Sequence, residues 1–254
     1  MNNQTEPVVI VGAARTPMGG FRGDLSGLGA AELGAAAIRA AVTDRTRLIF
    51  LDNPNNPTGT LIDRASFASF LRDLPETVII VVDEAYVDFV DPAERIDILG
   101  CIREPAGIPA VVSLRTFSKA FGLAGLRVGF GVMHREVADL LHRVRQPFNI
   151  SLVAQAGALA ALKDPAHYDH TLQATRAGRA WLQAEVERLG CRAYPSQANF
   201  FLIDVRGDAT RLYEAMLYKG VIVRAMRAYG YPDFIRITVG TEAENRRFVA
   251  ALGE

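Results

Sequence analysis

The chain has 254 residues, half of them hydrophobic, and its 28 lysines and arginines balance 28 aspartates and glutamates. This length is enough for one large domain or two smaller domains with a buried core. The zero net charge argues against nucleic acid or an anionic membrane as the main partner. Cys101 and Cys191 lie far apart, which is typical of a reduced, cytoplasmic protein. We expect no signal peptide and no membrane span, because no apolar run reaches about 18 residues.

The first forty-odd residues predict a strand at 8–11, a glycine-rich turn and an alanine-rich helix at 30–42. The turn lacks the G-x-G-x-x-G spacing of dinucleotide sites. The segment VVIVGAARTPMGGFRGDLSGLGAAELGAAAIRAAV instead resembles the N-terminus of thiolases, which are acetyl-CoA acyltransferases. No counterpart of the thiolase nucleophilic cysteine follows, so we expect no thiolase chemistry. The chain therefore looks chimeric, with a junction within residues 38–47.

Residues 46–52 predict a strand that runs into the loop N-P-N-N-P-T-G at 53–59. Two prolines and a glycine favour a tight, non-helical loop. Ligands of open α/β sheets bind at the carboxyl ends of the strands, so this loop is a candidate binding loop rather than an ordinary turn. A helix is expected next, at residues 67–74.

The wholly apolar run at residues 77–82 predicts a strand covered on both faces, and it ends in D-E-A-Y at 83–86. A carboxylate at the end of such a strand is costly unless it is paired. Asp83 is therefore a candidate partner for a cation, although on its own it could equally cap a helix or turn.

The segment VVSLRTFSKAFGLAGLR at residues 111–127 begins as a β-branched run and is expected to become a polar loop at 115–119. Of the three lysines, Lys119, Lys163 and Lys219, only Lys119 follows an apolar strand and lies among hydroxyl side chains. A lysine on a rigid scaffold can form a Schiff base with a carbonyl if its surroundings allow it to lose its proton. Taken alone, a loop lysine is more often simply solvated.

The rest of the chain predicts a strand at 128–133 and helices at 136–144, 151–162 and 170–189, with Gly190 as C-cap. His167 and His170 have helical metal-pair spacing, but without a third ligand nearby we expect no metal site. Strands are expected at 198–205, 221–224 and 234–239, and helices at 209–217 and 242–252. Arg224 and Arg236 fall in apolar strands, where a buried arginine needs an anion or an internal salt bridge.

These motifs resemble those of fold-type-I aminotransferases that use pyridoxal 5′-phosphate (PLP), and among them the histidinol-phosphate aminotransferases. The resemblance covers about residues 46–254 and is carried by S-L-R-T-F-S-K-A-F-G-L-A-G-L-R-V-G, D-E-A-Y, N-P-N-N-P-T-G, S-x-A-N-F, V-R-x-M and I-R-I-T-V-G. Where the family often has proline, this chain has Ala225.

The resemblance implies a role for each matched residue. Lys119 would carry PLP covalently, and Asp83 would keep the pyridine nitrogen protonated so that PLP remains an electron sink. Asn56 and Tyr86 would bond the ring oxygen. The cofactor phosphate would be held by Thr116, Ser118 and Arg127, the last through bidentate bonds. Substrate contacts would come from Arg236 at a carboxylate and from Arg224 and Asn199 at a distal phosphate.

The implied fold is α/β: a truncated fold-type-I large domain at residues 44–162 and a small α+β domain at 163–254, after the thiolase-like segment at 1–43. The implied activity is transamination between histidinol phosphate and 2-oxoglutarate, by a homodimer. Alternatives are a non-catalytic chimeric fragment and an aromatic amino-acid aminotransferase. In the family, the N-terminal part that is not recognisable here supplies a phosphate-binding helix start and a ring stacked on the pyridine.

Overall fold

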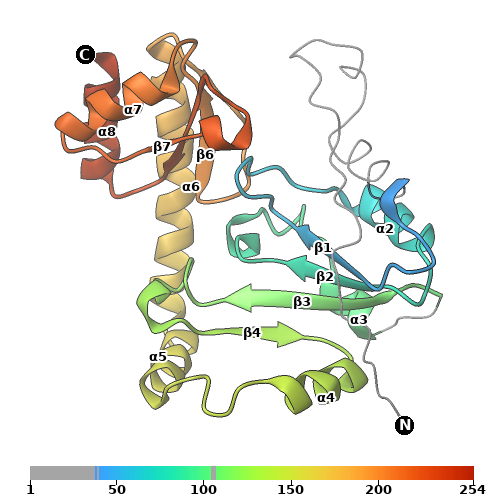
Figure 1. The fold of residues 1–254 in the computed structure, drawn as a ribbon. Helices are drawn as coiled ribbons and strands as arrows, with labels where there is room; N and C mark the ends of the chain where they lie inside the picture. Colours follow the sequence, from blue (N-terminus) through green and yellow to red (C-terminus); the bar gives the residue numbers. More distant parts are fainter. Residues whose placement is uncertain (1–37, 39, 104–106) are drawn as a thin grey trace.

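A computed structural model describes residue 38 and residues 40–103 and 107–254. Figure 1 shows two separate sheets, each flanked by helices, with one long helix passing beside both of them. The strand predicted at 8–11 and most of the helix predicted at 30–42 lie outside the described residues. The thiolase-like segment therefore stays a prediction.

The first sheet has the order β1 (Leu48–Asp52), β2 (Ile79–Asp83), β3 (Ala110–Thr116) and β4 (Gly129–Val132). The first three strands are parallel and β4 is antiparallel to β3. Helices α2 (Arg64–Arg72) and α3 (Ile98–Arg103) provide the crossovers and pack on one face against buried side chains such as Ile80 and Val82. Because the three strands are parallel, their carboxyl ends meet at one edge of the sheet.

The opposite face of this sheet is only partly covered in the structure. Leu48 and Phe50 lie two residues apart on β1, so both face this side of the sheet, and they are 45% and 70% exposed, respectively. Val81, the partner of Phe50 on β2, is buried. The expectation that the sheet is covered on both faces is therefore met at β2 and not at the edge strand β1.

The second sheet is antiparallel, with the order β5 (Arg192–Ala193), β6 (Phe200–Asp204), β8 (Phe234–Thr238) and β7 (Arg224–Ala225). Helices α7 (Ala209–Tyr218) and α8 (Glu242–Gly253) contribute to its core. So does the end of α6 (Pro165–Arg188), through the fully buried Leu182 and Val186.

The remaining elements connect the two sheets. Helices α4 (Arg135–Val144) and α5 (Leu152–Leu162) follow β4, and the 24-residue α6 then runs back past the first sheet to the second (Figure 1). Short 3-10 turns are η1 (Val87–Phe89), η2 (Ala124–Leu126) and η3 (Arg227–Tyr229). Within the described part of the chain, no helix combines the length and apolar character needed to cross a membrane.

Three predicted elements need correction. Strand β3 continues through Arg115 and Thr116, which were expected in a loop, because both residues pair with β4. Helix α6 begins at Pro165 rather than at 170, since proline suits the first helical turn and Asp164 caps it by accepting from the His167 amide. The strand expected at 221–224 is reduced to Arg224–Ala225, which alone pair with β8.

Candidate active site

The predicted motifs meet at the carboxyl edge of the first sheet. The amide of Asn53, just after β1, donates to the carbonyl of Asp83 at the end of β2, at 2.9 Å. The amide of Glu84 in turn donates to the carbonyl of Leu114 on β3, at 2.9 Å. These bonds join the start of the N-P-N-N-P-T-G loop, the D-E-A-Y segment and the strand that leads to Lys119.

The loop after β1 is fixed by side chains at its own base. The Asp52 carboxylate accepts from Asn55 Nδ2 at 2.9 and 3.0 Å and from the Asn56 amide at 2.9 Å. Asn53 is buried, and its Oδ1 accepts from the Ile62 amide at 2.8 Å. With the backbone held in this way, the exposed Asn56 side chain is presented at the edge of the sheet.

Asp83 is exposed, and its Oδ1 accepts from the Ala85 amide at 2.9 Å. It is therefore not the buried charge that the apolar strand suggested, because it lies where the strand ends. Tyr86, three residues later, is 8% exposed and packs in a cluster with Phe89, Ala120 and Phe200. The segment thus presents one accessible carboxylate beside one buried aromatic ring.

Lys119 lies against this cluster. Its Nζ is 5.2 Å from the centre of the Tyr86 ring. The next residue, Ala120, is fully buried, and the carbonyl of Lys119 accepts from the amide of Gly122 at 2.9 Å. Gly122 has a φ of 70°, a left-handed conformation that glycine adopts without a steric cost. The loop therefore holds Lys119 in a defined place.

The residues expected to hold a phosphate are local to this loop. The Thr116 hydroxyl accepts from the Ser118 amide at 3.0 Å. Arg127 is exposed, has a φ of 51°, and donates from Nη1 to the Ala124 carbonyl at 2.9 Å. No hydrogen bond joins Arg127 to Thr116 or Ser118 in the described residues, so their shared role stays a prediction.

Arg236 on β8 brings the second sheet to this edge. Its Nη1 donates to Oδ1 of Asn56, and its guanidinium carbon lies 4.6 Å from the centre of the Phe200 ring. Phe200 and Tyr86 meet edge to face, with ring centres 5.0 Å apart and planes at 88°. A continuous chain of contacts therefore runs from Lys119 through Tyr86, Phe200 and Arg236 to Asn56.

Phe200 was not among the predicted site residues. It is 1% exposed and lies in an apolar strand, where the sequence gives it the signature of an ordinary core residue. Its only sequence signal was its place in S-x-A-N-F. Asn199, the residue before it, accepts from the Val239 amide through its carbonyl at 2.9 Å, and the role expected of its side chain is untested.

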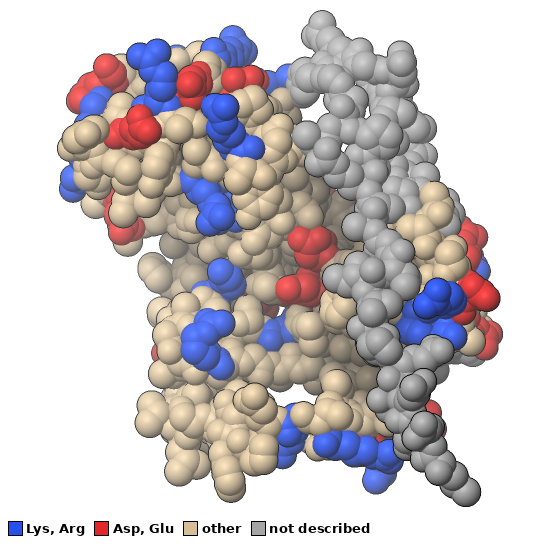
Figure 2. Space-filling model, viewed as in Figure 1, with Lys and Arg blue, Asp and Glu red and all other residues tan. Residues whose placement is uncertain are grey.

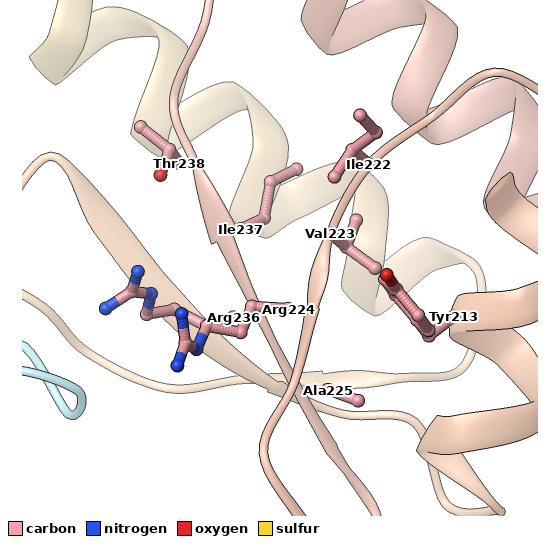
Figure 3. A pocket seen from close by; sticks show the side chains of 8 residues that line it. All are labelled: Tyr213, Ile222, Val223, Arg224, Ala225, Arg236, Ile237 and Thr238. Atoms are coloured by element: carbon pink, nitrogen blue, oxygen red, sulfur yellow. The ribbon is translucent and has the colours of Figure 1, made fainter.

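A pocket of about 570 Å³ opens beside Arg236 on the second sheet (Figure 3). Arg224 and Arg236 are paired across β7 and β8, and Figure 3 shows their guanidinium groups extending to the same side, away from Val223 and Ile237. Arg224 is exposed and lies 5.7 Å from the Tyr229 ring centre. The expectation that Arg224 is buried is wrong, because β7 is a short edge strand.

Helix α6 is anchored close to this edge by Tyr168. Its hydroxyl donates to Oδ1 of Asp88 at 2.8 Å, and its ring stacks on Phe121 at 4.9 Å between centres. Burial, together with the negative charge of Asp88, raises the pKa of Tyr168 to about 12. Asp88, which follows the D-E-A-Y segment, and Phe121, which follows Lys119, thus both contact Tyr168 on the long helix.

A model of the family "Aminotransferase class I and II" matches residues 28–252. The chain belongs to this family. The histidinol-phosphate aminotransferase of Desulfotalea psychrophila is 57% identical over 213 residues, covering 84% of this chain and 56% of the relative. That of Moorella thermoacetica is 44% identical over 242 residues, covering 95% of this chain and 60% of the relative. The chain thus spans little more than half the length of these relatives.

Solved structures give the same result for the fold. The histidinol-phosphate aminotransferase of Sinorhizobium meliloti in complex with PLP superposes with a TM-score of 0.73 at 28% identity, covering 88% of this chain and 60% of that one. The enzyme of Clostridium acetobutylicum gives 0.77 at 26% identity, covering 86% and 66%. The fold-type-I aminotransferase fold expected from the sequence is confirmed, over part of the full length of these enzymes.

The family's enzymes depend on PLP, and the side chains at this edge suit that group. PLP has an aldehyde, a basic pyridine nitrogen, a ring oxygen and a phosphate. Lys119 supplies an amine, Asp83 an accessible carboxylate, and Asn56 and Tyr86 hydrogen-bonding groups. The donor set therefore fits an organic cofactor with these groups.

Proposed function

We propose that this chain carries out PLP-dependent transamination, moving the amino group between histidinol phosphate and 2-oxoglutarate. The observation that supports the proposal is the contact chain from Lys119 to Asn56 through Arg236, because it brings the Lys119 amine and the Arg236 guanidinium to one edge of the first sheet. The names of the relatives in Desulfotalea psychrophila and Moorella thermoacetica support the choice of substrate.

Each side chain has a distinct task in this proposal. PLP, when bound, supplies an electron sink for the electrons of the substrate's α-carbon. Lys119 would hold the cofactor covalently, and its amine would take the proton from the α-carbon of the amino donor. The Asp83 carboxylate keeps a proton on the pyridine nitrogen. Asn56 and Tyr86 orient the ring through its oxygen, and Thr116, Ser118 and Arg127 hold the phosphate.

The second sheet supplies the substrate contacts. Arg236 binds a carboxylate of the 2-oxo acid, which suits its position beside Asn56. Arg224 and Asn199 face the phosphate of histidinol phosphate, with Arg224 at the rim of the pocket in Figure 3. In this assignment the large domain, at residues 44–162, holds the cofactor, and the small domain, at residues 163–254, selects the substrate.

Pairing of two copies belongs to the same proposal. Along α4, α5 and the loop between them, Val144, Phe148, Leu152 and Val153 are 77%, 99%, 82% and 69% exposed. Figure 2 shows few charged side chains over this lower left part of the molecule, where Figure 1 places α5. A contiguous apolar surface of this kind is typical of an interface, and we propose that it meets a second copy in a cytoplasmic homodimer.

The test is formation of glutamate from histidinol phosphate and 2-oxoglutarate by the protein supplied with PLP. Lys119→Ala should remove this activity completely. Asp83→Asn should fold normally and lower turnover at least about a hundredfold, the scale on which one preorganised electrostatic partner acts. Arg224→Ala should weaken the binding of histidinol phosphate. It should not change the binding of histidinol, which lacks the phosphate.

Two results would contradict the proposal. If the protein binds PLP but forms no more glutamate than Lys119→Ala does, a non-catalytic role is favoured. Faster turnover of aromatic amino acids than of histidinol phosphate would indicate an aromatic amino-acid aminotransferase instead.

A further inference from the structure

Glu84 is a buried carboxylate for which the proposed mechanism has no use. It is 2% exposed and directly follows the exposed Asp83. Its Oε2 accepts from the hydroxyl of Ser113 and from Nε of Arg115, the latter at 3.0 Å. Ser113 is fully buried, and the Arg115 side chain is 25% exposed. One carboxylate oxygen thus receives two donors from the neighbouring strand.

The two donors are placed so that Glu84 joins the ends of two strands. Ser113 and Arg115 are two residues apart on β3 and therefore face the same side of the sheet. The backbone amide of Glu84 donates to the carbonyl of Leu114, the residue between them, at 2.9 Å. Glu84 is therefore hydrogen-bonded to three successive residues of β3 at the point where β2 ends.

Both strands carry candidate site residues next to these contacts. On β2 the neighbour of Glu84 is Asp83, and on the strand β3 the residue after Arg115 is Thr116, which leads through Ser118 to Lys119. Any slip or splaying between the strand ends changes the distance from the Asp83 carboxylate to the Lys119 amine. Those two groups must reach opposite ends of one rigid ring.

A charged group is better suited to this task than an apolar one. A buried ion pair contributes little net stability, because desolvation offsets the attraction, but it tolerates only one geometry. The charge-assisted bond to Arg115 and the bond to Ser113 are directional, whereas apolar packing would allow the strands to shift.

We propose that Glu84 is a positioning residue that sets the spacing between Asp83 and Lys119 by clamping the ends of β2 and β3 through Ser113 and Arg115. The inference rests on the proposed function for its consequence, which is productive binding of PLP. It does not depend on that function for its geometry.

The test compares Glu84→Gln with Glu185→Gln. Glu185 also accepts from an arginine, Arg188, at 2.7 and 3.0 Å, but it lies on α6 away from the strand ends. The first readout is hydrogen exchange of backbone amides without cofactor. Glu84→Gln should speed exchange at residues 113–122, with the rest of both sheets unchanged, and Glu185→Gln should not change this segment.

The second readout is the dissociation constant for PLP, followed by its absorbance. Glu84→Gln should raise the dissociation constant for PLP by about tenfold or more. Loss of the residues that orient metal ligands has an effect of similar size on metal affinity. Ser113→Ala, which keeps the carboxylate paired with Arg115, should give the same changes to a smaller extent. This milder variant also decides the matter if Glu84→Gln does not fold.

Unchanged exchange at 113–122 in both Glu84→Gln and Ser113→Ala would overturn the inference. So would faster exchange spread evenly over the first sheet, which would indicate a general structural role. If the unmodified protein fails to bind PLP, the proposed function falls, while the exchange measurement still decides whether Glu84 clamps the two strands.

Discussion

Phe200 occupies the position where side chains from the two sheets meet. Its ring contacts the Tyr86 ring and also lies beneath the guanidinium group of Arg236. A cation held over an aromatic face gains about 0.5–2 kcal/mol, depending on its desolvation. Phe200 therefore keeps Arg236 oriented in addition to filling the core.

Phe200→Leu should consequently raise KM for 2-oxoglutarate by about 2- to 30-fold, which corresponds to the loss of the cation–π energy. Binding of PLP should change little. Phe201→Leu is the matched control, because Phe201 is equally buried but faces the core of the second sheet. Steady-state kinetics and urea unfolding check the pair. Equal KM values for both variants, with equal loss of stability, would show that Phe200 is only a core residue.

Tyr168 predicts a specific pH dependence. Its pKa is about 12 in the folded chain against an ordinary value of 10.0, because it is half-buried and donates to Asp88. The folded state holds the phenol proton more tightly, so this contribution to stability is complete below pH 10 and is lost as pH rises toward 12. Urea unfolding over this range should show a steeper alkaline loss in the unmodified protein than in Tyr168→Phe. Parallel curves would contradict the assignment.

The sequence singled out candidates whose chemistry is unusual for their place, and the roles of these candidates stay predictions. An isolated lysine after an apolar strand marked Lys119, and a carboxylate at a strand end marked Asp83. Phe200 and Glu84 could not be found in this way, because their importance depends on contacts with residues far away in the chain. The exposure of Arg224 was misjudged because it depends on how little of β7 pairs with β8.

At the scale of elements, local signals decided where the helices begin. Asp63 precedes α2 and accepts from the Ser66 amide at 2.9 Å, which is the usual N-cap arrangement. The bonds from the Ser66 hydroxyl and amide also lower the pKa of Asp63. Phe67, Phe70 and Leu71 of the same helix are buried against the first sheet. The cap therefore contributes to the stability of the helix that packs on the first sheet.

Asp63→Ala should lower the free energy of unfolding by about 1 kcal/mol, and Asp63→Asn should retain most of it, because asparagine also caps helices. The depressed pKa means that the contribution of the charged form is present above the ordinary aspartate pKa and is lost as pH falls through the folded value. Thermal unfolding of both variants at neutral and acidic pH measures this. An equal loss in both variants at neutral pH would show that the cap is not important.

The sequence pattern located most strands and helices of the described chain, because apolar runs and caps are local. Its errors included two strand boundaries that are set by pairing partners, the start of α6 and one short helix. The polar residues Arg115 and Thr116 belong to β3 only because β4 lies beside them. Helix α3 was not predicted, since its six residues carry too little periodic pattern.

Among the described residues, the edge strand β1 and the helices α4 and α5 expose large apolar side chains. Phe50 on β1 is 70% exposed, and Leu152 and Val153 on α5 are 82% and 69% exposed. Exposed edges and patches of this kind promote association. We expect the chain to associate or to be poorly soluble.

Leu152→Glu should shift the molecule toward the monomer in light scattering, because a buried unpaired carboxylate is costly in an interface. Ala166→Glu, on the exposed first turn of α6, is the control and should not change the oligomeric state. A monodisperse dimer that is unaffected by Leu152→Glu would place the interface elsewhere.

The central claim is that this chain assembles a PLP site around Lys119. The most direct measurement is reduction with borohydride in the presence of PLP, followed by peptide mapping of the pyridoxyl group. The chain offers two other lysines as internal controls, Lys163 and Lys219. We predict that the adduct lies on Lys119, at close to one per chain. An adduct mainly on Lys163 or Lys219, or spread evenly over all three, would contradict the account.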